Sequence, residues 1–196
     1  MGTVFSHPKL RYSRGPNPRR NFPTKSARKR GESNFLRAFE RTYLSSLSVS
    51  GLARADFDFS GYGIADLVWV SWQSSVNPDD MTAVGLTERP KVRVMAFELK
   101  LDDWRGALRQ AFRYSYFANC SVVVLPPAVA QRAKHHLADF RQLRVGLWSF
   151  EPKTGKVARL FTPRHGRPRN ASVQQKARAN TRSGYSSSQR ARTSSP

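Results

Sequence analysis

The stretch RVMAFELKLDDWRGALRQAFRYSYFANCSVVVLP, residues 93–126, predicts a strand, a helix and a second strand. In the first strand, Glu98 and Lys100 are two residues apart, so their side chains project from one face. The other face carries Met95, Phe97 and Leu99. A carboxylate and an ammonium at the end of an apolar strand are costly to bury unless their charges are compensated, as a metal ion and a phosphate would do. An ion pair on a half-exposed edge strand is the alternative.

The segments around this stretch favour a site over a surface ion pair. Residues 63–70 form another apolar strand, with Asp66 near its start. In the helix that follows Lys100, Gln110 and Tyr114 are four residues apart and share one face. Residues 121–125 are a short run rich in β-branched side chains, which is typical of a fully buried strand.

This series of Asp66, Glu98-x-Lys100, a helix with Gln110 and the strand VVVLP resembles the PD-(D/E)xK nuclease superfamily. The similarity is closest to small bacterial and phage members, in which an ELK tripeptide precedes a helix with a set pattern. The matching residues are Glu98-Leu99-Lys100, Asp103-Trp104, Ala107-Leu108, Gln110-Ala111 and Tyr114. The resemblance covers roughly residues 32–150 and implies an α/β fold with a restriction-endonuclease-like αβββαβ core, in which helices flank a central mixed β-sheet.

The resemblance also implies a site for Mg²⁺ or Mn²⁺ that hydrolyses DNA phosphodiester bonds to a 5′-phosphate and a 3′-hydroxyl. Asp66, Glu98 and the carbonyl of Leu99 would hold the ion, since hard cations prefer oxygen ligands. Lys100 would orient the attacking water, take its proton or stabilise charge on the phosphate, and the sequence does not choose among these roles. Gln110 would position Lys100 or the water. By itself, Asp66 would be interpreted as a strand-end carboxylate that accepts hydrogen bonds from a turn.

A further acid comes from the first predicted helix, residues 32–48, whose apolar residues recur at steps of three and four. In the resembling families a glutamate at the start of this helix faces the metal site, and Glu32 occupies that position. It would hold the metal through a water or bind a second ion. Capping of the helix N-terminus is the alternative role. Glu40, which also lies near the apolar face, competes with Glu32, and we favour Glu32.

Basic residues are concentrated at the two ends of the chain. Residues 1–31 contain nine Lys and Arg and no acid, residues 164–196 contain eight and no acid, and residues 32–163 contain 17 beside all 13 acids. We therefore predict a nuclease-like domain at 32–163 between two disordered basic arms. Such arms gain affinity for nucleic acid by releasing counterions from its phosphates. The side chains expected to contact it are those of Lys25, Arg28, Lys29, Arg30, Arg164, Arg167 and Arg169.

The remaining elements follow from local patterns. We expect strands at 53–59, 64–72, 91–100, 145–150 and 157–161, and helices at 103–117 and 127–140. Between the second and third strands, residues 73–90 contain Asn-Pro-Asp-Asp and are expected to form a mobile flap.

Composition excludes several classes. The single cysteine, Cys120, rules out an internal disulfide framework. No apolar run is long enough to span a membrane, and the N-terminus has no apolar signal core, so we expect a cytoplasmic, nucleoid-associated protein. A protein that binds nucleic acid without cutting it is the alternative function. The sequence has no clear dimer signal, and a homodimer is left open.

Overall fold

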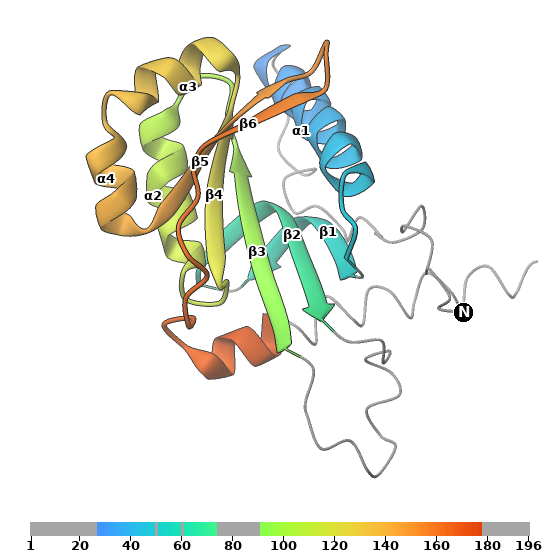
Figure 1. The fold of residues 1–196 in the computed structure, drawn as a ribbon, viewed down its shortest axis with the longest axis vertical. Coiled ribbons are helices and arrows are strands. Elements are labelled where there is room, and N and C mark those ends of the chain that lie inside the picture. Colours follow the sequence, from blue (N-terminus) through green and yellow to red (C-terminus); the bar gives the residue numbers. More distant parts are fainter. Residues whose placement is uncertain (1–26, 50, 60, 74–90, 178–196) are drawn as a thin grey trace, which may run out of the picture.

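The computed structural model describes residues 27–49, 51–59, 61–73 and 91–177 of the chain. These residues form a six-stranded sheet with helices on both faces (Figure 1). The strands are β1 (Gly51–Phe59), β2 (Gly63–Gln73), β3 (Lys91–Leu99), β4 (Cys120–Leu125), β5 (Val145–Glu151) and β6 (Lys156–Phe161). The helices are α1 (Ala27–Ser45), α2 (Trp104–Tyr114), α3 (Pro127–Lys134) and α4 (Leu137–Leu143), and residues 171–177 are also helical.

The strands lie in the sheet in the same order as in the chain. β1, β2 and β3 are antiparallel neighbours, β3, β4 and β5 run parallel, and β6 is antiparallel to β5. Parallel neighbours need a crossover connection, which α2 supplies between β3 and β4, and α3 with α4 between β4 and β5. The predicted α/β class, with a central mixed sheet flanked by helices, is therefore confirmed.

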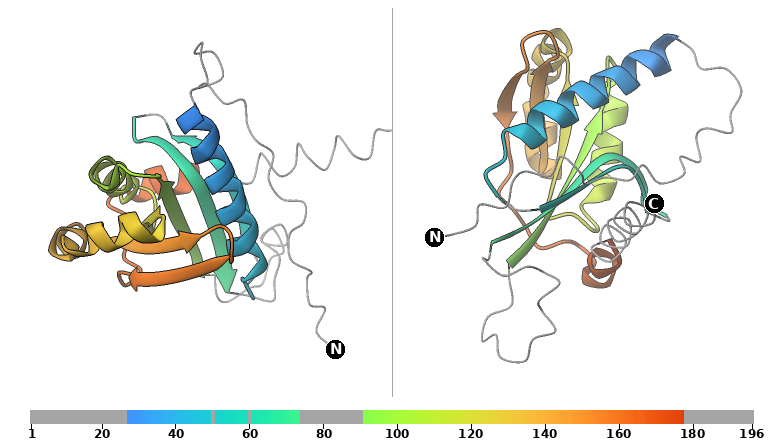
Figure 2. Two further views of the ribbon diagram at one scale, coloured as in Figure 1. Left: turned by 90° about the horizontal axis from the view of Figure 1, so that it is seen from above. Right: turned by 90° about the vertical axis from the view of Figure 1, so that its right-hand side faces the viewer.

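The sheet separates two apolar cores, with α1 on one face and α2, α3 and α4 on the other (Figure 2). From α1, the first core receives Phe35, Leu36, Phe39 and Tyr43. On β3, Phe97 and Leu99 belong to the α1 core, while Val94 and Ala96 belong to the α2 core. This is the alternation expected of a strand buried on both faces. By the same alternation, the carboxylate of Glu98 lies on the α2 side.

Two helices differ from their predicted bounds. α1 begins at Ala27, before the predicted start at Glu32. The helix predicted at 127–140 is broken at His135 and His136 into α3 and α4. The break places the imidazole of His136 over the indole of Trp104, with ring centroids 4.8 Å apart, so packing between helices outweighs the local helical pattern. Residues 74–90, most of the expected flap, lie outside the described residues.

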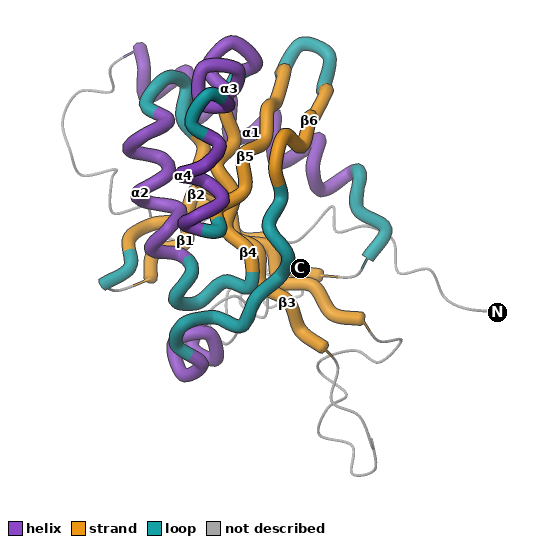
Figure 3. The backbone as a smooth tube through the Cα atoms, turned by 60° about the vertical axis from the view of Figure 1, so that its left-hand side comes forward, coloured by secondary structure: helices purple, strands orange, loops and turns teal. Residues whose placement is uncertain are grey.

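The expectation of disorder from residue 164 onward is wrong for residues 164–177. This segment runs from the end of β6 past the sheet to a last helical piece at 171–177 (Figure 3). Its backbone bonds to the turn after α2, since the amides of Gly166, Arg169 and Asn170 donate to the carbonyls of Asn119, Ser115 and Tyr116. The folded unit therefore extends beyond the predicted boundary at 163.

Asn119 holds this C-terminal segment at its centre. Its side-chain nitrogen donates to the carbonyl of Gly166 at 2.9 Å, and its side-chain oxygen accepts from the amide of Val94 at 2.8 Å and from Nε2 of Gln174 at 2.7 Å. Ala177 is completely buried in the α2-side core. These contacts hold in place a segment whose composition is typical of disordered chains. Residues 1–26 and 178–196 of the expected arms lie outside the described residues.

No helix in the described ranges is both long enough and apolar enough to cross a lipid bilayer.

Candidate functional site

Two acids meet where β2 begins and β3 ends. The antiparallel pairing of Leu67 with Phe97 puts Asp66 beside Glu98 on the neighbouring strand, and the two face α2. Oδ2 of Asp66 accepts a hydrogen bond from the backbone amide of Leu99 at 2.8 Å. The donor is a strand residue rather than the turn considered for the structural role of Asp66, and the bond fixes the carboxylate against the end of β3.

The ammonium of Lys100 lies among the oxygens of the expected metal ligands. Its Nζ is 2.6 Å from Oε1 of Glu98, 3.3 Å from the carbonyl oxygen of Leu99 and 3.9 Å from Oδ2 of Asp66. The first two contacts are hydrogen bonds that Nζ donates, and the third is a longer ion pair. Three oxygens, from two strands, thus converge on one position that holds a positive charge.

Glu98 is the most deeply buried acid of this group, with no exposed surface. Burial, together with the negative charge of Asp66, raises the pKa of Glu98 to about 7, although Lys100 and Tyr114 act to lower it. Burial also works against the charged form of Lys100, but the charges of Glu98, Asp66 and Glu32 outweigh it and raise the pKa of Lys100. The lysine is therefore held as a cation, whereas the glutamate is close to its titration point at neutral pH.

Of the two glutamates in α1, Glu32 is the one placed near the site. A Cβ on its neighbour Gly31 would lie 3.0 Å from Cδ1 of Leu101, so the first turn of α1 packs against the chain that leaves β3. Glu32 is also one of the acids whose charge raises the pKa of Lys100. Glu40 lies two turns further along the helix and is nearly buried, at 5% exposed.

Gln110 and Tyr114 share a face of α2 as expected, but only the tyrosine reaches the acids. The Tyr114 hydroxyl lies 2.5 Å from Oε2 of Glu98 and 2.7 Å from the carbonyl oxygen of Ile64. Within the described part of the chain, the half-buried Gln110 forms no hydrogen bond to Lys100 or Glu98. The four-residue spacing was visible in the sequence, but it did not show which of the two side chains would reach the strand end.

The Tyr114 contacts bear on the charge of Glu98. A phenol has one proton, and the carbonyl of Ile64 can only accept. Both short contacts are satisfied when Tyr114 donates to Ile64 and a protonated Glu98 donates to Tyr114. When Glu98 is ionised, the Tyr114 hydroxyl donates to its Oε2 instead, which stabilises the carboxylate and opposes the effect of burial on the pKa of Glu98.

Neither a family model nor a curated protein matches the sequence.

The residues expected to contact nucleic acid are only partly described. Lys25 lies outside the described residues, as do the side chains of Arg28 and Lys29. Arg30 is exposed in the first turn of α1, at the same end of the helix as Glu32. The remaining three, which are exposed on the ordered C-terminal segment, are Arg164, Arg167 and Arg169.

A cleft of about 370 Å³ adjoins the chain that follows β3. Its walls are Asp102, Asp103, Trp104, Arg105, Arg132 and His136. Asp103 caps α2 by accepting from the amide of Gly106 at 2.8 Å. The Arg105 guanidinium lies 4.4 Å from the centre of the Trp104 ring. The cleft therefore combines acids, bases and an aromatic ring beside the strand end.

Proposed function

We propose that the protein is a metal-dependent nuclease with a restriction-endonuclease-like core, which hydrolyses DNA phosphodiester bonds with Mg²⁺ or Mn²⁺. The observation that carries this proposal is the convergence of oxygens from Asp66, Glu98 and Leu99 on the position of the Lys100 ammonium. The same oxygens are the ligands implied by the resemblance to the PD-(D/E)xK superfamily.

The donor set suits a hard cation. Two carboxylates and a carbonyl are the ligand types that Mg²⁺ takes, and Mg²⁺ keeps several waters, so few protein ligands suffice. A structural zinc site would need about four nitrogen or sulfur ligands, and no group of three or more His, Cys, Asp or Glu lies close enough for a metal in the described ranges. Glu32 would add a further acid near the ion, through a water.

Each side chain then has a defined task. Asp66 and Glu98 hold the ion, and Tyr114 fixes the orientation of Glu98 by contacting its Oε2. A bound ion would supply Lewis acidity and lower the pKa of a coordinated water. Because Lys100 is held as a cation, we assign it to orienting the water and stabilising negative charge on the phosphate, rather than to accepting the proton. Gln110 is assigned to the substrate side of α2, where it would position the water.

One observation favours the alternative, a protein that keeps this fold and binds nucleic acid without cutting it. The Lys100 ammonium contacts both acids, and when Glu98 is protonated its single charge balances that of Asp66 without a metal. In that case Asp66, Glu98 and Lys100 would be structural residues that close the end of the β2–β3 pair.

Metal-dependent cleavage distinguishes the two functions. Plasmid and single-stranded and branched oligonucleotides are incubated with the parent protein in Mg²⁺, Mn²⁺ or EDTA, beside Asp66→Ala and Lys100→Ala. Lys134→Ala, which removes an exposed lysine from α3, is the matched control. We expect cutting that requires metal, is lost in both site variants and persists in the control. Cutting by both site variants at the parent's rate would show that the site is wrong, and binding without any cutting would support the alternative.

A further inference from the structure

A cluster of aromatic rings and one arginine side chain lies at the C-terminal end of α2. The Arg169 guanidinium lies 4.7 Å from the ring centre of Phe112 and 5.9 Å from that of Tyr116. The ring of Tyr116 lies 5.1 Å from the ring of Tyr62, in the turn between β1 and β2. Tyr62 and Tyr116 are half-buried, so part of each ring faces solvent. Three segments distant in sequence thus build one surface of partly exposed rings.

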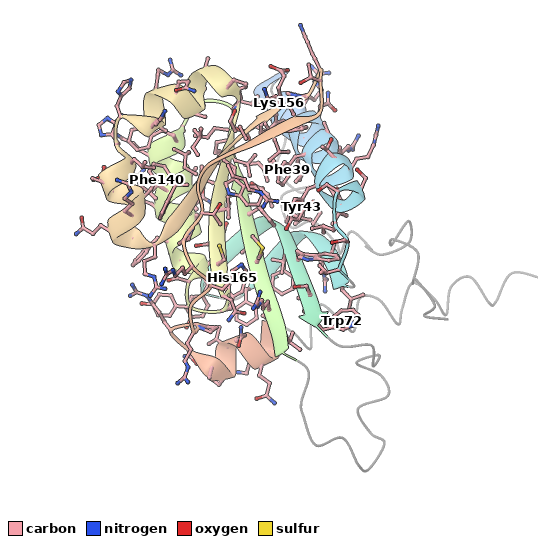
Figure 4. All side chains as sticks on the ribbon, in the orientation of Figure 1. Phe39, Tyr43, Trp72, Phe140, Lys156 and His165 are labelled. Carbon is pink, nitrogen blue, oxygen red and sulfur yellow. The ribbon has the colours of Figure 1, made fainter. Side chains whose placement is uncertain are left out.

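The same surface is positively charged. Arg113 and Arg169 of this surface are exposed, as are Arg164 and Arg167 elsewhere on the C-terminal segment, and none of the four forms an ion pair with any acid among the described residues. Burial and, to a lesser extent, the positive charge of Arg93 lower the pKa of His165, which is labelled in Figure 4. Asp58, an acid of β1 four residues before Tyr62, is exposed, and its backbone lies opposite Ile64 in the β1–β2 pairing. Exposed guanidinium groups that pair with no acid are suited to phosphate oxygens.

This surface adjoins the residues that support the candidate site. Tyr62 is followed by Gly63, where an added Cβ would lie 3.6 Å from Nη2 of Arg113 and 4.0 Å from the Tyr114 ring. The carbonyl of the next residue, Ile64, contacts the Tyr114 hydroxyl, which in turn contacts Glu98. Because Tyr114 and Glu98 are buried, these contacts join the rings to the acids through the interior, and a strand bound across the rings would lie close to the candidate site.

We propose that Tyr62, Arg113, Tyr116 and Arg169 bind a single-stranded segment of DNA, with unpaired bases against the tyrosines and phosphates against the arginines. This inference rests on the proposed function, because it names the class of substrate delivered to that site. Duplex DNA would offer phosphates to the arginines but no base faces to the rings, whereas every unpaired base has a face that can stack. Structures with an unpaired strand, such as flaps and gaps, are then the preferred substrates.

Binding measured in EDTA tests this surface without requiring any cleavage. Fluorescence anisotropy compares a labelled single-stranded 20-mer with the duplex of the same sequence, using the full chain. The variants are Arg169→Ala and Tyr62→Leu. Their matched controls are Arg141→Ala, an exposed arginine whose guanidinium lies over the ring of Phe161, and Tyr62→Phe, which keeps the ring. Circular dichroism melting verifies that each variant is folded.

We expect tighter binding of the single strand than of the duplex, and a loss of about fivefold or more for Arg169→Ala and Tyr62→Leu on the single strand. The dependence of log affinity on log salt should weaken by about 0.7 for Arg169→Ala, as for one lost phosphate contact. Both controls should stay within about twofold of the parent.

Different results overturn different claims. If Tyr62→Leu binds as Tyr62→Phe does, or Arg169→Ala as Arg141→Ala does, this surface is not the strand site. If the parent prefers the duplex, the substrate class is wrong. If the variants lose binding as expected but the parent cuts no DNA with metal, the surface stands and the nuclease proposal fails.

Discussion

Replacing Glu98 with glutamine is expected to stabilise the fold above neutral pH. The carboxyl has no exposed surface, and its pKa is raised from 4.5 to about 7. A raised pKa means that the folded protein holds the proton more strongly than the unfolded chain does. The contribution of Glu98 to the free energy of unfolding is therefore fully present below pH 4.5 and is lost as the pH rises through about 7. Glutamine imitates the protonated acid and carries no such loss.

The size of the effect follows from the shift. Each pKa unit is equivalent to about 1.4 kcal/mol, so the change from 4.5 to about 7 amounts to about 3 kcal/mol. Glutamine keeps the contacts, since its oxygen can accept from Lys100 and its amide can donate to the Tyr114 oxygen. Glu98→Gln should thus equal the parent at pH 4.5 and exceed it by about 3 kcal/mol at pH 8, or about 6–12 °C in Tm.

Urea unfolding of parent and variant between pH 4.5 and 8 measures this difference. Asp58→Asn, which removes an exposed acid from β1, is the control and should show no such trend. A Glu98→Gln advantage that does not grow with pH, or a variant less stable than the parent at pH 8, would contradict the reasoning. If the acid is a metal ligand, Mg²⁺ should raise the Tm of the parent and not that of the variant. A stabilised variant without activity would show that the acid is kept for chemistry.

Three further substitutions test other contacts. Tyr114→Phe should cost about 1–3 kcal/mol in urea unfolding, because Glu98 and the carbonyl of Ile64 lose a partner; an unchanged midpoint would show that the hydroxyl contributes nothing to stability. Lys100→Met should cost about 3–5 kcal/mol at pH 8, since it leaves the acids uncompensated, and less at pH 4.5, where Glu98 is protonated; a Tm loss independent of pH would contradict this. Asn119→Ala should cost about 2–4 kcal/mol through its three side-chain hydrogen bonds and should speed trypsin cleavage within 164–177; a digestion pattern like the parent's would argue against it.

The strands were predictable because their signal is local. The alternation along β3 predicted that Glu98 and Lys100 project from one face and Phe97 and Leu99 from the other, and in the fold the second pair packs against α1. The run of β-branched residues at 121–125 predicted β4 for a similar reason, since a strand buried on both faces is apolar along most of its length.

The order of the C-terminal segment was not predictable from local composition. Its hydrogen bonds with Asn119 join residues 47 and 55 positions apart, and no window of sequence contains both partners. The break between α3 and α4 is similar, because residues 128–140 contain neither Gly nor Pro and the contact of His136 with Trp104 is made only in the folded chain. Sequence reasoning therefore misses structure that depends on partners brought in by the fold.

For the site, the sequence supplied the residue types and the resemblance supplied their roles. The alignment of Asp66 beside Glu98 depends on the β2–β3 register, which the strand patterns alone leave undetermined. The three contacts of the Lys100 ammonium and the reach of Tyr114, rather than Gln110, across to the acids depend on how α2 packs on the sheet. These contacts depend on packing, so the sequence identified the residues of the site but not their arrangement.

The order of strands in the sheet has a consequence for how the protein folds. Each strand pairs with the one made just before it, so no strand has to enter between two that are already joined. The sheet can grow at one edge as synthesis proceeds, and only the two parallel additions have to wait for a crossover helix. Asp66, Glu98 and Lys100 come together when β3 joins β2, at about half of the chain's length, and α2 then adds the tyrosine. The acids are thus assembled well before the C-terminal segment arrives to hold the end of α2.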